Sequence, residues 1–227
     1  MRMTVRDVMT ADVVSVHEKT SFHAVAEELL GHGVSGLPVV DGDGRVVGVV
    51  SECDLLAKEE YKECSPGDGY RPSLRTRMRH NLGSEGSGYH KAHGETAGEL
   101  MTSPAHVTTP DAPVVLAARL MDRHGVKRLP VVDASGRLAG IVSRRDLIKV
   151  FLRPDADIRR LVLESVPDGV DVAVRDGLVT LSGTVERRAQ ARAAVRLAEG
   201  VDGVVAVRDG LAWRLDDDVD VPVRGGA

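Results

Sequence analysis

The chain has 227 residues, of which 42% are hydrophobic and 3% aromatic, and its formal net charge is −4. This indicates a globular protein with one large or two small domains, and the mild acidity argues against a general nucleic-acid binder. No 18 apolar residues run together, so we expect no membrane-spanning helix. The two cysteines, Cys53 and Cys64, are too few for a disulfide framework, so we do not expect secretion and predict a cytoplasmic protein.

The first predicted elements are two helices. Thr4 is expected to cap a short helical turn that ends at Met9-Thr10. From Thr20 onward, apolar residues recur at helical spacing until Gly31 and Gly33, which can end a helix. The residues on that predicted buried face are Phe22, Val25, Ala26, Leu29 and Leu30.

Two short apolar strands follow, and they occur twice in the chain. Residues 33–55, GVSGLPVVDGDGRVVGVVSECDL, return 92 positions later as residues 125–147, GVKRLPVVDASGRLAGIVSRRDL, with 14 of 23 positions identical and no gap. Each copy contains an L-P-V-V-D strand, a turn with glycine and a second strand, which predicts a hairpin. An internal repeat indicates one structural unit that is used twice and packs against its own copy.

Each second strand ends in Gly-x-x-Ser-x-x-Asp followed by an apolar helix start. One interpretation is a capping box, in which the acid reaches back to the backbone N–H of the serine. The other is a nucleotide site, because a helix start attracts phosphate and a carboxylate can accept the hydroxyls of a ribose. Both interpretations stay open from the residues alone.

The segment between the copies, residues 57–95, is rich in Gly, Ser, Pro and charge and lacks a sustained apolar period. We therefore expect a flexible insertion with one helical turn near Leu74–Met78. A zinc site is an alternative for part of it, but the spacing of the candidate ligands matches no usual metal pattern. Those candidates are Cys64, His80, His90 and His93.

A third pattern begins beyond Phe151. An amphipathic helix is predicted over 155–166, then a hairpin whose turn is Asp176-Gly177, then a helix from about Glu186 to Ala198 and a last strand over 204–211. The aspartate-rich residues 212–227 are expected to form a frayed, solvated tail.

The repeated copies resemble CBS domains, and two in one chain resemble a CBS pair, or Bateman module. The resemblance covers about residues 4–56 and 96–151 and includes both Met-Thr pairs, the L-P-V-V-D strands and both Gly-x-x-Ser-x-x-Asp segments. It implies an α/β fold with a first unit over 1–56 and a second over 96–151, packed as a pseudo-two-fold pair. It also implies a homodimer formed through these units.

The CBS resemblance further implies a ligand and its contacts. In that family the Ser and Asp bind the ribose and phosphate of AMP, ATP or a relative, residues after Met-Thr frame the base, and residues before the L-P-V-V strand reach phosphates. An adenine nucleotide (AMP, ADP or ATP) and no metal are therefore expected. The implied nucleotide-binding residues are Ser51, Asp54, Ser143, Asp146, Val13, Val14, Ala105, His106, Lys127 and Arg128.

The two copies differ in charge at matched positions. The second copy has Lys127, Arg128, Arg144 and Arg145 where the first has Ser35, Gly36, Glu52 and Cys53. Charge-assisted bonds to phosphate are strong, so these cations favour phosphate binding in the second copy. Solvated surface cations are the alternative.

Residues 155–211 resemble a BON domain, with α-β-β-α-β order, chiefly through D-G-L-V-T-L-S-G-T-V at 176–185 and G-V-D-G-V-V-A-V at 200–207. The family is associated with phospholipid or periplasmic partner binding, and its motif carries no catalytic residue.

Two functions follow as expectations. The first is a cytoplasmic regulatory protein whose CBS pair binds an adenine nucleotide and whose BON domain relays the state to a protein partner or phospholipid surface. The alternative is an adaptor that uses the CBS pair only as a dimerisation scaffold. An enzyme is not expected, because the sequence shows no catalytic Ser/His/Asp set, P-loop or metal ligand set.

Overall fold

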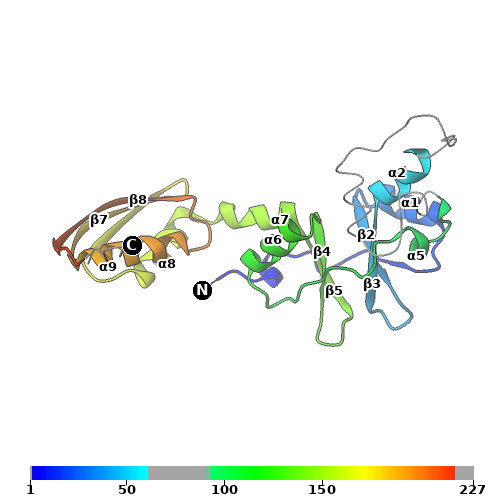
Figure 1. The fold of residues 1–227 in the computed structure, drawn as a ribbon, viewed down its shortest axis with the longest axis horizontal. Coiled ribbons are helices and arrows are strands. Elements are labelled where there is room, and N and C mark those ends of the chain that lie inside the picture. The colour runs from blue at the N-terminus through cyan, green and yellow to red at the C-terminus, as the bar shows by residue number, and fades with distance from the viewer. Residues whose placement is uncertain (1, 61–90, 92, 218–227) are drawn as a thin grey trace, which may run out of the picture. The chain divides into compact units, whose positions relative to one another are not determined.

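The structure is a computed structural model that describes residues 2–60, 91 and 93–217. The chain divides into two compact units, Thr4–Leu147 and Met1–Met3 with Ile148–Ala227 (Figure 1). Several predictions lie outside the described residues: the helical turn at Leu74–Met78 and the candidate metal ligands Cys64, His80 and His90.

The first copy is a small sheet with two helices. Its strands pair in the order β1-β2-β3, with β1 parallel to β2 and β2 antiparallel to β3. The elements are a 3-10 turn η1 (Val5–Asp7), β1 (Val16–His17), α1 (Phe22–Gly31), β2 (Gly36–Val40), β3 (Val46–Ser51) and α2 (Glu52–Glu60).

The second copy repeats this pattern. β4 and β5 are antiparallel. In place of β1, the second copy has a single parallel bridge between Thr108 and Val131, which are the repeat equivalents of Val16 and Val39, the residues that pair in β1 and β2. The elements are α5 (Ala97–Leu100), α6 (Val114–Arg123), β4 (Arg128–Val132), β5 (Leu138–Ser143) and α7 (Arg144–Ile148).

Both hairpins turn on an aspartate. The Oδ1 atom of Asp41 accepts the backbone N–H groups of Asp43 and Arg45, each at 2.9 Å. Asp133 does the same for Ser135 and Arg137 in the second copy. A side chain that bonds its own backbone two residues on fixes the turn, and these N–H bonds stabilise the ionised acids. They therefore lower the pKa of Asp41, and with the Ser135 hydroxyl they lower that of Asp133.

The two copies are joined by pairs of contacts related by the 92-residue shift. Thr10 bridges Ile141 on β5, and Thr102 bridges Val49 on β3. In addition, Arg45 bridges Arg137, so the two hairpins meet at equivalent positions and lie side by side in Figure 1. The predicted pseudo-two-fold pair of CBS-like units is confirmed.

A buried apolar cluster sits between the first sheet and its helices. Ala97 and Leu100 belong to α5, so the start of the second repeat completes the core of the first copy. The cluster comprises Val16, Val25, Leu29, Leu37, Val39, Val50, Ala97 and Leu100. The first four residues of the predicted insertion, 57–60, belong to α2, which continues to Glu60 with Ala57 buried and Lys58 bonded to the carbonyl of Gly94.

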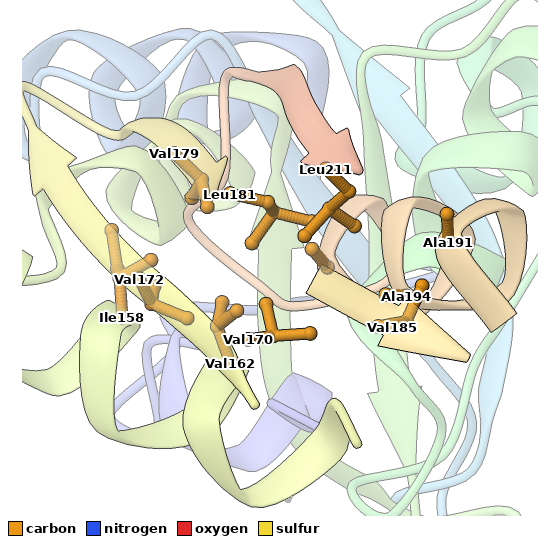
Figure 2. Packing of buried hydrophobic residues seen from close by; sticks show 11 residues of the cluster. Ile158, Val162, Val170, Val172, Val179, Leu181, Val185, Ala191, Ala194 and Leu211 are labelled. Atoms are coloured by element: carbon orange, nitrogen blue, oxygen red, sulfur yellow. The ribbon is translucent and has the colours of Figure 1, made fainter. Parts of the chain in front are cut away.

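The C-terminal unit is a three-stranded sheet with two helices over one face. The strand order is β6-β7-β8, with β6 antiparallel and β8 parallel to β7. Side chains from the three strands and the two α-helices meet in one buried cluster, which Figure 2 shows. The elements are a 3-10 turn η2 (Lys149–Leu152), α8 (Asp155–Ser165), β6 (Val170–Arg175), β7 (Leu178–Arg187), α9 (Arg188–Glu199) and β8 (Ala206–Leu215).

The hairpin between β6 and β7 has the predicted Asp176-Gly177 turn. Both residues have positive φ, 52° and 73°, as a type I′ turn requires. Asp155 at the start of α8 accepts the N–H groups of both turn residues, at 2.8 and 2.9 Å. The turn is therefore held by the first helix as well as by its own backbone preference.

Two predicted boundaries in this unit were wrong. β7 runs to Arg187, past the expected helix start at Glu186, and β8 runs to Leu215, past the expected end at 211. Residues 212–217 of the predicted tail are thus ordered: Asp216 pairs with Arg188 at 3.2 Å, and Asp217 accepts the N–H of Ala189 at 2.9 Å. Carboxylates are stabilising at the first turn of a helix such as α9, because its N–H groups have no partners within the helix.

Candidate nucleotide site

The site begins at the corner where β3 meets α2. The Oδ2 atom of Asp54 accepts the backbone N–H of Ser51 at 2.8 Å and its hydroxyl at 2.7 Å. This is the geometry of a capping box, in which the third helical residue holds the residue before the helix. Only one carboxylate oxygen is needed for it, so a capping role leaves the other oxygen available for a second contact.

The second copy builds the same corner between β5 and α7. The Oδ2 atom of Asp146 accepts the N–H of Ser143 at 2.9 Å and its hydroxyl at 2.6 Å. The N–H of Asp146 in turn points to the Ser143 hydroxyl at 3.4 Å. The structure therefore brings together both predicted Ser–Asp pairs and places them at equivalent ends of equivalent strands.

Each corner is bordered by the Met-Thr segment of the other copy. Thr102 pairs with Val49 on β3 and Thr10 with Ile141 on β5. The glycine of each motif makes this close approach possible: a Cβ on Gly48 would overlap the Met101 side chain, and one on Gly140 would overlap Met9. The glycine of Gly-x-x-Ser-x-x-Asp thus leaves room for the methionine of the other copy to pack against the strand.

A lysine that the sequence did not single out lies at the first corner. Lys91 Nζ is 2.5 Å from Asp54 Oδ1 and 3.0 Å from Thr102 Oγ1. Lys91 and Asp54 are 8% and 9% exposed. Lys91 lies in the insertion, which has no regular pattern, and 37 residues separate it from Asp54, so no local signal predicts the contact.

Arg128 reaches toward the first copy. Its guanidinium donates to the Ser35 hydroxyl at 2.5 Å, and a Cβ on Gly36 would overlap it. Burial lowers the pKa of Arg128, and the nearby Glu52, Cys53 and Asp54 oppose that effect. Arg128 was predicted to serve phosphate in the second copy, whereas its charge lies among the acidic residues of the first corner.

The other predicted cations are on the surface of the second copy. Lys127, Arg144 and Arg145 are exposed, and the carbonyl of Lys127 accepts the N–H of Arg144 at 3.1 Å. α7 has five residues, so its dipole is small. Positive charge at this corner therefore comes mainly from side chains.

The residues expected to frame the base are half-buried on the segments that cross between copies. Val13 and Val14 follow Thr10, and Ala105 and His106 follow Thr102. The ring of His106 stacks on that of His124 at the end of α6, with centroids 3.7 Å apart. His124, the exposed C-cap residue of α6, is thus part of this surface. Burial, together with His124, lowers the pKa of His106.

The described part of the chain contains neither a cluster of metal-ligating side chains nor a membrane-spanning helix. Within residues 2–60, 91 and 93–217, no three His, Cys, Asp or Glu side chains gather in a way that could hold a metal ion. In the same part of the chain, every helix is too short or too polar to cross a bilayer.

Comparison with known families matches all three units. Residues 5–60 and 97–153 match the CBS domain, and residues 154–214 match the BON domain. These matches agree with the two interlocked copies and with the separate C-terminal sheet.

Two relatives illustrate the similarity. The uncharacterized protein MJ1426 of Methanocaldococcus jannaschii is 32% identical over 157 residues, which are 66% of this chain and 92% of that protein. The chloroplastic CBS domain-containing protein CBSX2 of Arabidopsis thaliana is 33% identical over 159 residues, which are 66% of this chain and 64% of that protein.

A solved structure of CBSX2 in complex with AMP is also similar. It has a TM-score of 0.52 and 34% identity, and the match covers 66% of this chain and 96% of that one. The chain therefore belongs to the CBS-domain proteins, with a pair of CBS domains followed by a C-terminal BON domain.

Proposed function

We propose that the CBS pair binds an adenine nucleotide, AMP, ADP or ATP, and that the protein acts as a regulator without a catalytic step of its own. The observation that carries this proposal is the matched pair of Ser–Asp corners, each bordered by a threonine of the other copy. A carboxylate at such a corner can accept ribose hydroxyls, as an acid does in dinucleotide-binding folds. The similarity to a protein that was solved with AMP supports the same ligand class.

The second corner is proposed as the stronger phosphate site. Lys127, Arg144 and Arg145 belong to it and are exposed, so they can reach a phosphate without first losing a buried partner. The equivalent positions of the first copy hold Ser35, Glu52 and Cys53, which offer no positive charge. A phosphate gains charge-assisted bonds at the second corner. The two cations at the first corner, Lys91 and Arg128, are already hydrogen-bonded to Asp54 and Ser35.

Calorimetric titration with AMP, ADP and ATP tests the proposal. We expect at least one of them to bind, and Asp146→Ala to weaken binding by about 1–3 kcal/mol, the usual cost of removing one partner of a charged hydrogen bond. Asp146→Asn keeps an oxygen for the Ser143 N–H and removes the charge, which separates ligand binding from capping. Asp122→Ala changes an exposed acid on α6 and should bind as the wild type does.

Failure of every adenine nucleotide to bind at millimolar concentration would reject the sensor function and favour the adaptor.

We propose that the BON domain relays the bound state to a protein partner or a phospholipid surface.

A further inference from the structure

The ammonium of Lys91 occupies the side of Asp54 that the capping box leaves open. Asp54 Oδ2 is engaged by Ser51, while Oδ1 lies 2.5 Å from Lys91 Nζ. The same ammonium donates to Thr102 Oγ1 at 3.0 Å. Lys91 thus contacts both copies at the point where their segments meet, and it is almost fully buried there.

The backbone around Lys91 is tied to the first copy. The carbonyl of Lys91 accepts the N–H of Gly94 at 3.1 Å, and the carbonyl of Gly94 accepts Lys58 Nζ from α2 at 3.2 Å. The carbonyl of Glu95 accepts the N–H of Phe22 on α1 at 2.7 Å. These bonds hold the chain close to the corner, so the side chain needs no large movement to reach Asp54.

We infer that Lys91 is a built-in competitor for the first nucleotide site, so that a ribose binds Asp54 only when the ammonium withdraws. This inference rests on the proposed function and adds its regulation at one of the two sites. The Lys91 ammonium lies on Asp54 Oδ1, and Asp54 is only 9% exposed with the lysine in place. A ribose hydroxyl therefore has no open approach to this oxygen until the lysine side chain moves.

The consequence is a lower apparent affinity at the first site. When a binding-competent state is populated only in part, the apparent dissociation constant rises in inverse proportion to that fraction. Hydrogen bonds between charged groups at low exposure are stronger than neutral ones. The state with Lys91 withdrawn is therefore the minor one without ligand.

Calorimetry in the Asp146→Asn background measures the first site by itself. We expect Lys91→Met, which keeps the length of the side chain and removes its charge, to tighten binding of both AMP and adenosine by about 10- to 100-fold. Adenosine carries the ribose without phosphate, so it isolates the competition at Asp54. Lys91→Arg retains a cation and should restore weak binding, and Lys19→Met, at an exposed lysine, should change nothing.

Each contrary result identifies what fails. Unchanged affinity on Lys91→Met, or no binding by either variant while the wild type binds through Asp146, overturns the inference and leaves the proposed function standing. Weaker AMP binding with unchanged adenosine binding also overturns it, because Lys91 would then be a phosphate ligand. Absence of any adenine ligand on the wild type and on Lys91→Met removes the proposed function itself.

A second measurement uses the wild-type chain and does not depend on how the variants fold. Reductive methylation followed by mass spectrometry reports the access of reagent to each lysine. We expect Lys91 to react much more slowly than Lys19 without ligand, and to gain reactivity with saturating AMP. Equal rates for Lys91 and Lys19 without ligand, or a Lys91 rate unchanged by AMP, would contradict the inference.

Discussion

At the scale of single residues, one aspartate in each copy both caps a helix and is proposed to bind the ligand. Asp54 and Asp146 each hold the N–H and hydroxyl of a serine with Oδ2. Substitution by alanine therefore removes a cap as well as a ligand contact, and a lost cap typically costs about 1 kcal/mol. Variants that keep an acceptor oxygen are the sharper test of binding, because the capping bond can survive in them.

The second copy has a histidine, His106, where the first copy has a valine. It occupies the position of Val14 in the repeat and stacks on His124, whose own counterpart is His32. Because burial and His124 lower the pKa of His106, protonation is less favourable in the folded chain than in the unfolded one. The unfolded chain then binds more protons over the range between the two pKa values.

We expect this contribution to stability to be present above the ordinary histidine pKa of about 6.5 and to be lost as the pH falls through the lower folded value. Urea unfolding at a series of pH values from 8 to 5, for the wild type and His106→Phe, measures it. The variant keeps an aromatic ring against His124 and cannot titrate, so the wild type should lose more stability than the variant on acidification.

The matched control is His32→Phe, at the equivalent helix end of the first copy, where His32 is paired with Glu28 at 3.2 Å. We expect the His32→Phe variant to lose as much stability on acidification as the wild type does, and so more than His106→Phe. Parallel pH profiles for the wild type and His106→Phe would show that the His106–His124 stack carries no such linkage.

At the scale of elements, local patterns were enough to predict the strands, hairpins and most helices. The apolar runs and the aspartate and glycine turns act within a few residues, so they are visible in the sequence. The predicted helix from Thr20, ended by Gly31 and Gly33, is α1, and the predicted 155–166 helix is α8.

Long-range pairing was not predictable in the same way. The exchange of Met-Thr segments between copies, the Lys91–Asp54 pair and the contact of Arg128 with Ser35 join residues 37 to 131 positions apart. The repeat indicated that the copies pack together, but not which edges meet. The ends of β7 and β8 were missed because their last residues are paired with each other, Arg187 with Leu215, and have no strong strand pattern of their own.

The helices of the CBS pair leave large aliphatic side chains in solvent. Leu30 on α1, Leu56 on α2 and Leu116 on α6 are 82%, 61% and 50% exposed. Single exposed leucines are common, but both copies present them on helices, and symmetric dimers are the commonest oligomers. We propose that these helices form the homodimer contact implied by the CBS resemblance.

Light scattering at tens of micromolar tests the dimer. The wild type should show twice the chain mass of 24.3 kDa, and the pair Leu56→Asp with Leu116→Asp should shift the mass toward one chain, because burying an unpaired carboxylate is costly. Leu163→Asp, on α8 of the BON domain with 38% exposure, serves as control and should remain dimeric. A wild-type mass of a single chain would contradict the proposal.

At the scale of the whole molecule, the CBS pair and the BON domain are connected by a short stretch of chain. The Asp146 corner opens α7, the 3-10 turn η2 follows from Lys149 to Leu152, and only Arg153 and Pro154 precede α8. The ring of Pro154 restricts the backbone at this junction. The chain between the proposed nucleotide corner and the BON domain therefore contains few residues outside regular elements.

Hydrogen exchange across residues 155–215 measures whether that connection transmits the bound state. Coupling requires the nucleotide to have different affinities for two states of the chain, and the effect is then reciprocal. With typical coupling energies, saturating nucleotide should change protection of some BON amides by about fivefold or more. Asp146→Asn, at the same nucleotide concentration, should show no such change if the second corner is the source. A domain that is coupled to ligand binding must change at least some of its opening equilibria when the ligand saturates its site. Equal protection with and without nucleotide in the wild type would therefore mean that the BON domain does not respond to the CBS pair.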